Sequence, residues 1–398
     1  MDITIYPGRL SGTVQPGASK SLLHRYLICA ALADQPTHIH CSTSCDDVEA
    51  TIDCLRAIGA QIQQTNDGYF VIPISGLPEC AVLKCRESGT TLRLLLPVVG
   101  ALGIDATFHL SGRLAMRPIA PLWDEMERMG CSLSHCSDDI IRCCGQLQNG
   151  EYNIDSSISS QFVSGLLIAL SLLPGINSLH VHGQQESKPY IHMTRQILSQ
   201  FGVNVEGNII HGSYSLKSPL DITVEADWSS AAFFMAANSL NNEIRIGGLY
   251  DNSLQGDRIV TEYLKCLEVN CNIDVSDAPD LLPVLSVVAA SRKGATFTGI
   301  HRLRYKESDR ITSVCSMLRN CGIDLTVTDN SLTIKPGGFQ ACTVDSFSDH
   351  RIAMAAAIAA TVAEGPITIL NAQCVNKSYP RFWEEYRKLG GSYAQYIR

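Results

Sequence analysis

Charged and hydroxyl side chains stand at the start of several otherwise apolar segments of this chain. The first of these segments reads PGASKSLLHR and contains Lys20, Ser21 and Arg25. A glycine turn that leads into a helix aims backbone N–H groups in one direction, and the two cations add positive charge beside them. This arrangement suits a phosphate or a carboxylate ligand. The spacing differs from that of a nucleotide-binding P-loop, so ATP is disfavoured.

Four further segments of the first half have the same character. In ESGTTLR, Gly89 lets a ligand approach the backbone and Thr90 offers a hydroxyl. Arg117 precedes a proline that we expect in the first turn of an amphipathic helix, and its guanidinium can fork onto a carboxylate. SSQ at 159–161 and SKPY at 187–190 add hydroxyls and an amide. Taken singly, each segment is also explained by an ordinary capped helix.

The second half carries the densest run of charge, RYKESDR. Lys306 and Arg310 are four residues apart, which predicts one helix face, and Glu307 beside them is a candidate acid or base. Asp280 is predicted to open an apolar helix, a poor place for a purely structural carboxylate. Two more charged positions follow in the sequence, at DHR 349–351 and at Lys377.

Six repeats of one pattern supply these helix starts. Each copy opens with a predicted Ser or Asp N-cap and continues as a buried, apolar helix: Ser19–Ala33, Ser88–Gly103, Ser159–Gly175, Asp227–Leu240, Asp277–Ser291 and Ser348–Gly365. A second, amphipathic family follows in step, with a glycine at the end of most copies. The step is about 70 residues, with one short step near 50 between the fourth and fifth copies, which indicates a repeated supersecondary unit.

Short β-like runs lie between the helices, so each unit is predicted to hold two helices and several strands. The runs are Ile3–Tyr6, Ile39–Cys41, Tyr69–Ile72, Ala106–Leu110, Leu179–Val181, Ile244–Ile246, Ala295–Thr298 and Ile367–Leu370. An α/β protein with three units to a domain follows from this pattern.

Composition bounds the class of protein. A chain of 398 residues exceeds one ordinary core, so two domains are expected. A net charge of −8 disfavours nucleic-acid binding, and no apolar run is long enough to cross a membrane. The 16 cysteines are scattered without a C-x-x-C pair, and no secretion signal is expected at the N-terminus, which favours reduced thiols over disulfides or metal ligands.

Together the segments resemble the 3-phosphoshikimate 1-carboxyvinyltransferase (EPSP synthase) family over essentially the whole chain. The matching segments stand in family order: PGASKSLLHR, SGTTLRLL, SSQF, SKPY, DAPD, RYKESDRI, SDHRIAMA and CVNKSYP. The resemblance implies the enolpyruvyl transferase fold, an α/β fold of two domains. Each domain would hold three repeated β/α units as an inverse α/β barrel, with buried parallel helices and the sheets outside. One domain would comprise 1–18 plus 226–398 and the other 19–225, with the active site in the cleft between them.

The resemblance also implies an activity. The enolpyruvyl group of phosphoenolpyruvate would pass to the 5-hydroxyl of shikimate 3-phosphate by addition and elimination, in the shikimate pathway towards chorismate and the aromatic amino acids. Acid and base groups carry such a reaction, so no cofactor and no metal are expected. The partners would be the two small-molecule substrates, with no nucleic acid and no membrane, and the protein would be a cytoplasmic monomer.

Residue roles follow from the same resemblance. The catalytic residues would be Lys20, Lys306, Glu307 and Asp280, the last as the base for the 5-hydroxyl. Shikimate 3-phosphate would be held by Lys20, Ser21, Arg25, Ser159, Ser160, Gln161, Ser187, Tyr190, Asp280 and Lys306. Phosphoenolpyruvate would be held by Lys20, Gly89, Arg117, Gln161, Arg310, Arg351 and Lys377.

Two other readings stay open. One is the UDP-N-acetylglucosamine enolpyruvyl transferase family, which shares fold and donor but pairs Lys with Asn where this chain has Lys20 and Ser21. The other is a scaffold of the same fold without catalysis, which would have lost the charges at the helix starts. Glu87 and Arg302 depart from the residues common in the EPSP synthase family at their positions.

Overall fold

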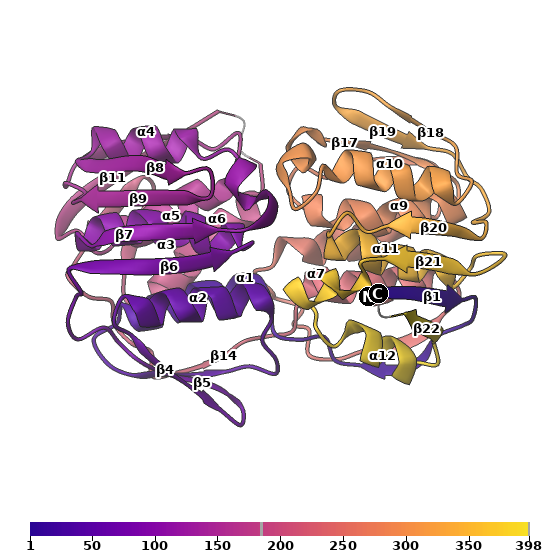
Figure 1. Cartoon of the computed structure of the whole chain (residues 1–398), viewed down its shortest axis with the longest axis horizontal. Coiled ribbons are helices and arrows are strands. Elements are labelled where there is room, and N and C mark those ends of the chain that lie inside the picture. Colours follow the sequence, from indigo (N-terminus) through magenta and orange to yellow (C-terminus); the bar gives the residue numbers. More distant parts are fainter. Residues whose placement is uncertain (184–185, 397–398) are drawn as a thin grey trace. The chain divides into compact units, whose positions relative to one another are not determined.

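The computed structural model describes residues 1–183 and 186–396, and the chain folds into two compact units. Unit 1 comprises Met1–Gly17 and Ala226–Arg398, and unit 2 comprises Ala18–Glu225. Unit 2 is therefore inserted into the sequence of unit 1. The strands of both units form mixed sheets against buried helices (Figure 1).

Unit 2 contains three sheets, each with two helices. The strand orders are β14 (Asp221–Thr223), β3 (Thr37–His40), β5 (Gly68–Ile72), β4 (Gln61–Thr65); β6 (Cys80–Arg86), β7 (Asp105–Leu110), β9 (Ile140–Gly145), β8 (Cys131–Ser137); and β10 (Glu151–Asp155), β11 (Gly175–His182), β13 (Ile209–Gly212), β12 (Asn204–Glu206). The buried helices are α1 (Lys20–Ala31), α3 (Gly89–Leu102) and α5 (Ser160–Leu170). The amphipathic helices are α2 (Asp46–Ala57), α4 (Ala120–Arg128) and α6 (Lys188–Gln200), and a 3-10 turn, η1 (Gly112–Met116), precedes α4.

Unit 1 repeats the plan. Its sheets are β20 (Cys342–Asp345), β21 (Ile367–Leu370), β1 (Asp2–Tyr6), β22 (Ser392–Tyr396); β16 (Cys271–Asp274), β17 (Ala295–Thr298), β19 (Ser331–Ile334), β18 (Leu325–Val327); and the pair β15 (Glu243–Ile246), β2 (Ser11–Val14). The buried helices are α7 (Trp228–Ser239), α9 (Leu282–Ser291) and α11 (His350–Ala360). The others are α8 (Val260–Cys266), α10 (Arg310–Asn320) and α12 (Phe382–Lys388), with 3-10 turns η2 (Gly256–Ile259), η3 (Pro279–Leu281), η4 (His301–Tyr305) and η5 (Ala372–Lys377).

The predicted repeat is visible in how the strands pair within each sheet. Five of the six sheets in the described residues run parallel, antiparallel, antiparallel across their four strands, as in β6–β7, β7–β9 and β8–β9. A parallel pair needs a crossover connection, and in four of these sheets a buried helix supplies it: α3, α5, α9 or α11. In the fifth sheet β14 joins β3 from near the end of unit 2, while α1 precedes β3. Every predicted β-like run overlaps a strand. Other antiparallel strands beside them, such as β9 and β13, were not predicted.

The N-caps explain where most buried helices begin. Ser88, Ser159 and Asp227 accept backbone N–H groups of the first turn through their side chains, as predicted. Ser19 holds the N-cap position of α1 without such a bond. Two predictions were wrong: Asp349, not Ser348, caps α11, because its carboxylate accepts the N–H of Arg351, and α9 begins at Leu282 after the turn η3 rather than near Asp277.

The structure joins Cys266 and Cys271 as a disulfide, whereas the sequence favoured reduced thiols over disulfides. In the described part of the chain the other cysteines form no disulfide, and most are buried. Within the same residues, no helix is long and apolar enough to cross a membrane.

Candidate active site

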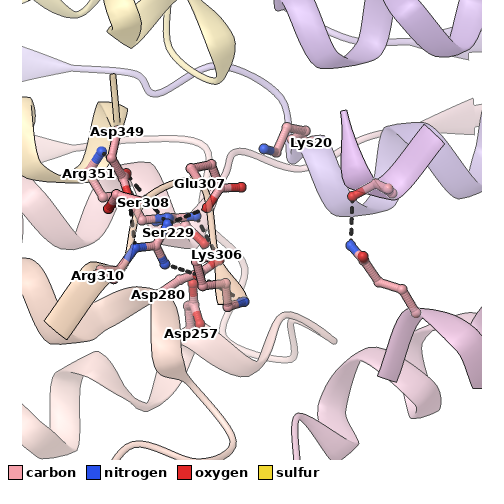
Figure 2. Close-up of polar contacts among 12 residues, drawn as sticks. Lys20, Ser229, Asp257, Asp280, Lys306, Glu307, Ser308, Arg310, Asp349 and Arg351 are labelled. Atoms are coloured by element: carbon pink, nitrogen blue, oxygen red, sulfur yellow. Dashed lines mark hydrogen bonds and ion pairs between the residues drawn. The ribbon is translucent and has the colours of Figure 1, made fainter. Parts of the chain in front are cut away.

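Arg310 is the centre of the charged cluster in unit 1. Its side chain is fully buried at the first position of α10. The guanidinium donates from Nε to Asp349 Oδ2 at 3.0 Å, from Nη1 to Asp280 Oδ1 at 2.6 Å and from Nη2 to Glu307 Oε2 at 2.6 Å. Figure 2 shows the carboxylates converging on it from separate segments. Burial alone would lower the pKa of Arg310, but the three carboxylates outweigh burial and raise it.

Asp280 lies among three cations. Its Oδ2 accepts from Arg351 Nη2 at 2.9 Å, while Oδ1 is 3.5 Å from Lys306 Nζ in addition to its bond from Arg310. Burial would raise the pKa of Asp280. The charges of Arg351, Lys306 and Arg310 exceed that effect and hold the pKa well below its ordinary value. Asp280 is therefore ionised in this arrangement.

Lys306 occupies a different place from the one predicted. It lies in extended backbone between η4 and α10, so it does not share a helix face with Arg310. The extended backbone nevertheless brings its ammonium to Asp280. Burial lowers the pKa of Lys306 to about 8, with Asp280 opposing the shift. An amine with a pKa near neutrality can give up or take a proton at working pH.

A further carboxylate beside this cluster was missed by the sequence analysis. Asp257, in η2, is buried and accepts a hydrogen bond from Ser229. Burial, together with the negative charge of Asp280, raises the pKa of Asp257 to about 6. Its surrounding sequence, SLQGDRIV, carries no pattern that distinguishes it from a loop aspartate.

In unit 2, Lys20 is the first residue of α1, as predicted. Its ammonium donates to Asp47 Oδ2 at 2.8 Å, and Asp47 stands in the first turn of α2. Asp47 was not predicted as a site residue. Because the lysine is only 16% exposed, the aspartate fixes its direction rather than leaving it solvated.

Gly89 and Arg117 lie together in unit 2. A Cβ added at Gly89 would lie 2.7 Å from Arg117 Nη1, so a larger residue here would displace the guanidinium from this position. Arg117 directly follows η1 and stands three residues before the start of α4, so the proline in the first turn of α4 is Pro121 and not the predicted Pro118. The side chain of Glu87, which departs from the family, lies against Gly112 at the start of η1.

Gln161 is linked to the start of α3 by two hydrogen bonds. Its Oε1 accepts from Arg93 Nη1 at 3.0 Å, and its Nε2 donates to Thr90 Oγ1 at 2.8 Å. Arg93 also donates to the carbonyl of Pro118 at 3.2 Å and stands 5.4 Å from the ring centroid of Phe162. Arg93 thus connects two predicted ligand-binding segments. It is the last residue of the segment ESGTTLR, and the sequence analysis assigned it no role.

Arg25 is buried, and its guanidinium contacts helices α5 and α6. It donates to Thr194 Oγ1 at 2.7 Å, to Ser164 Oγ at 3.3 Å and to the carbonyls of Ser21 and Tyr190. Burial lowers the pKa of Arg25 to about 10. These bonds hold the backbone of two predicted ligand residues in place.

Most of the remaining predicted residues lie at helix starts, and Lys377 lies at the end of a 3-10 turn. Ser187 precedes α6 with a φ of 56°, a left-handed conformation that a serine adopts only when its surroundings impose it. Ser159 and Ser160 are buried at the start of α5, and Lys377 ends η5. Each unit therefore gathers cations and hydroxyls at the starts of its helices, and most of its cations are paired with carboxylates or carbonyls, an arrangement suited to an anionic ligand.

The comparisons with known proteins agree with this reading. A solved EPSP synthase from Acinetobacter baumannii aligns with 99% of this chain and 100% of its own at 27% identity, with a TM-score of 0.79. The enolpyruvyl transferase NikO from Streptomyces tendae, at 20% identity, has the same fold with a TM-score of 0.75. The fold is thus that of the enolpyruvyl transferases.

Sequence comparison identifies the family. The model of the EPSP synthase (3-phosphoshikimate 1-carboxyvinyltransferase) family matches residues 5–386. The 3-phosphoshikimate 1-carboxyvinyltransferase of Clostridium kluyveri is 37% identical over 98% of this chain and 97% of its own, and that of Clostridium botulinum strain Alaska E43 is 35% identical over 98% of each. The chain belongs to the EPSP synthase family. The family and the α/β enolpyruvyl transferase fold predicted from the sequence are thereby confirmed.

Proposed function

We propose that this chain transfers the enolpyruvyl group of phosphoenolpyruvate to the 5-hydroxyl of shikimate 3-phosphate and releases phosphate. Membership of the EPSP synthase family makes it a transferase of the shikimate pathway, which leads to the aromatic amino acids. The observation that carries the proposal is the cluster in which Asp280 contacts Arg310, Arg351 and Lys306. Each of these four side chains stands in a segment that matches the family.

The roles are divided between the units. In unit 2, Ser21, Arg25, Ser159, Ser160, Gln161, Ser187 and Tyr190 hold shikimate 3-phosphate, and Gly89, Arg117 and Gln161 hold phosphoenolpyruvate. In unit 1, Arg310, Arg351 and Lys377 bind the anionic groups of phosphoenolpyruvate, while Lys306 contacts shikimate 3-phosphate. Lys20 contacts both substrates. The family resemblance supports these roles, and the approach of Arg117 to Gly89 and the two bonds of Gln161 fit them.

Asp280 acts as the base for the 5-hydroxyl once the substrates are bound. Between three cations, its carboxylate is a weak base because its pKa is far below the ordinary value. Anionic substrates that bind Arg310, Arg351 and Lys306 share the positive charge, so the pKa of Asp280 rises. The base therefore gains strength only in the filled site. The hydroxyl oxygen attacks C2 of phosphoenolpyruvate as Asp280 takes its proton.

A proton must reach the methylene carbon of phosphoenolpyruvate in the same step, and one must leave the new methyl group when phosphate departs. Glu307, bonded to Arg310, and Lys306, with its pKa of about 8, are the candidates for this proton traffic. The tetrahedral intermediate then loses phosphate to give the enolpyruvyl ether. The two protons balance, and the chemistry draws on no redox step.

The domain assignment of the sequence analysis completes the proposal. Residues 1–18 with 226–398 and residues 19–225 form the two domains, the active site lies in the cleft between them, and substrate binding closes it. The protein acts as a cytoplasmic monomer. Small-angle scattering with and without both shikimate 3-phosphate and an unreactive phosphoenolpyruvate analogue tests the closure, and an unchanged profile would contradict it.

Phosphate release is the direct test of the activity. The purified protein is mixed with phosphoenolpyruvate and either shikimate 3-phosphate or UDP-N-acetylglucosamine. We expect release with shikimate 3-phosphate alone, lost in Asp280→Asn and retained in Asp324→Asn, a change at an exposed carboxylate of unit 1. Release with the sugar nucleotide alone would refute the proposal. The proposal would also be refuted if the folded protein bound both proposed substrates but released no phosphate.

A further inference from the structure

Two histidines and two aspartates meet on the outer face of one sheet of unit 2. His38 and His40 alternate along β3 with buried Thr37 and Ile39, so both imidazoles point away from the core. Asp221 pairs directly with His38 from the neighbouring strand β14. Asp67 comes from the turn between β4 and β5. Segments far apart in the sequence thus bring four metal-binding side chains to one place.

The two aspartates contact opposite nitrogens of the two rings. Asp67 Oδ2 is 2.8 Å from His40 Nδ1, and Asp67 Oδ1 is 3.2 Å from His38 Nε2. The other nitrogen of each ring faces Asp221: His40 Nε2 lies 3.2 Å and His38 Nδ1 3.9 Å from the same Oδ1. The Asp67 carboxylate therefore orients both rings. His38 Nδ1 and His40 Nε2 both face the carboxylate of Asp221.

The ligand atoms of His38, His40 and Asp221 lie within 4.8 Å of one another, a spacing that a metal ion can draw together. A ligating histidine commonly donates its second N–H to a carboxylate, which fixes the ring and raises its basicity. Tetrahedral ligands at about 2.0–2.2 Å from zinc lie roughly 3.3–3.6 Å from one another. The nitrogen-to-oxygen distances of 3.2 and 3.9 Å are close to that spacing. The two rings stand side by side with centroids 4.0 Å apart.

The orienting carboxylate is itself fixed. Thr65 Oγ1 donates to Asp67 Oδ1 at 2.8 Å, and the backbone N–H of Cys41 donates to the carbonyl of Asp67 at 2.8 Å. Two imidazole nitrogens and one carboxylate oxygen form a donor set that suits Zn²⁺ better than Mg²⁺ or Ca²⁺, which prefer oxygen ligands.

We propose that His38 Nδ1, His40 Nε2 and Asp221 bind a zinc ion, with Asp67 holding both imidazoles and a water in the fourth position. The ion joins β14 to β3. The segment after β14 carries Glu225, whose carbonyl accepts the backbone N–H of Ser19 at the N-cap of α1. The ion thereby stabilises the connection beside the start of α1 and takes no part in the transfer reaction.

Zinc binding to chelator-treated protein tests the site. Calorimetric titration with Zn²⁺, and the visible spectrum of the Co²⁺ form, should give a tetrahedral site of micromolar or tighter affinity. His38→Ala/His40→Ala should remove one equivalent, whereas His180→Ala, an exposed histidine on β11, should keep it. The comparison is needed because exposed Cys80 and Cys136 can also bind Zn²⁺. An unchanged number of bound ions in the double variant overturns the proposal.

The orienting role of Asp67 has its own test. Asp67→Asn keeps the three ligands and removes the charge behind both rings, so Zn²⁺ affinity should fall about 10- to 100-fold. Hydrogen exchange of β14 should slow with Zn²⁺ in the unaltered protein and stay unchanged in the double variant. Binding only at millimolar Zn²⁺, or equal exchange with and without the metal, refutes the site.

Discussion

His24 should make unit 2 sensitive to acid. The side chain is fully buried in α1, and its Nδ1 is 2.7 Å from Thr51 Oγ1. Thr51 in turn is 2.7 Å from Thr91 Oγ1, which donates to Ser88 Oγ, the N-cap of α3. With those hydroxyl protons committed, His24 Nδ1 is the donor to Thr51. Burial lowers the pKa of His24 to about 3, so the imidazole is neutral at physiological pH. It connects the starts of two helices that carry proposed substrate contacts.

The magnitude follows from the pKa. Burial lowers the pKa of His24 from 6.5 to about 3, and the described residues offer Nε2 no hydrogen-bond partner. Between these two values the unfolded chain binds a proton that the folded chain excludes, so stability falls as pH falls. The loss is about 1.36 kcal/mol per pH unit, or about 2.5 kcal/mol between pH 7 and pH 4.5.

The assay compares the unaltered protein with His24→Asn, whose amide can donate to Thr51 without titrating. Urea unfolding of unit 2 is followed at both pH values by hydrogen exchange of α1 peptides, because a chain of two units need not unfold in one step. At neutral pH, His24→Asn should be less stable than the unaltered protein. Between pH 7 and pH 4.5 the difference between their free energies of unfolding should shift by about 2.5 kcal/mol in favour of the variant. His180→Asn, an exposed change in the same unit, is the control. A difference that stays constant to within about 0.5 kcal/mol would refute a buried neutral His24.

Three other substitutions give distinct outcomes. Gly165→Ala places a Cβ well inside van der Waals contact with the carbonyl oxygen of Arg93, where α5 packs on α3, and should destabilise unit 2 by about 1–3 kcal/mol in chemical unfolding. Gly89→Ala displaces the Arg117 guanidinium and should raise KM for phosphoenolpyruvate about tenfold, the equivalent of one lost contact of about 1.4 kcal/mol. Asp257→Asn removes a carboxylate whose pKa burial and Asp280 raise to about 6. The folded protein loses stability as pH rises through 6, because Asp257 must then ionise in a buried place. The variant should therefore be more stable than the unaltered protein by about 1–3 kcal/mol at pH 7, and this gain should be absent near pH 4.

Each of these has a control or a contrary result. Gly8→Ala, in open space, should leave stability unchanged where Gly165→Ala does not. A KM for phosphoenolpyruvate that Gly89→Ala leaves unaltered would separate Gly89 from the proposed subsite. Asp324→Asn is the control for Asp257→Asn. If the free energy of unfolding has the same pH dependence in both variants, ionisation of Asp257 does not destabilise the fold.

The sequence predicted the repeats and most helix starts because both depend on local chemistry. An N-cap such as Ser88 or Asp227 and an apolar run behind it are visible within a dozen residues. The start of α9 was misplaced because a 3-10 turn, set by tertiary packing, replaces the first helical turn. Lys306 was wrongly placed on a helix, because its four-residue spacing from Arg310 does not reveal that the backbone at Lys306 is extended.

The candidate site was predicted in its cations but not in its supporting carboxylates. Lys20 and Arg310 stand in dense motifs, whereas their partners come from other segments of the chain. Asp47 and Asp257 acquire importance only through burial beside a distant charge, which no local pattern encodes. Arg93 was visible in its motif, but its bond to Gln161 depends on the packing of α3 on α5.

The insertion of unit 2 into unit 1 imposes an order on biosynthesis. β1 pairs with β21 and β22, the last strands of the chain, so the first strand made has no partner until the end of translation. At 5–20 residues per second the nascent chain waits roughly 20–80 s for them. All of unit 2 emerges meanwhile and can fold first. β1, an apolar segment without neighbours throughout that interval, is the part of the newborn chain most exposed to mispairing and most in need of chaperone cover.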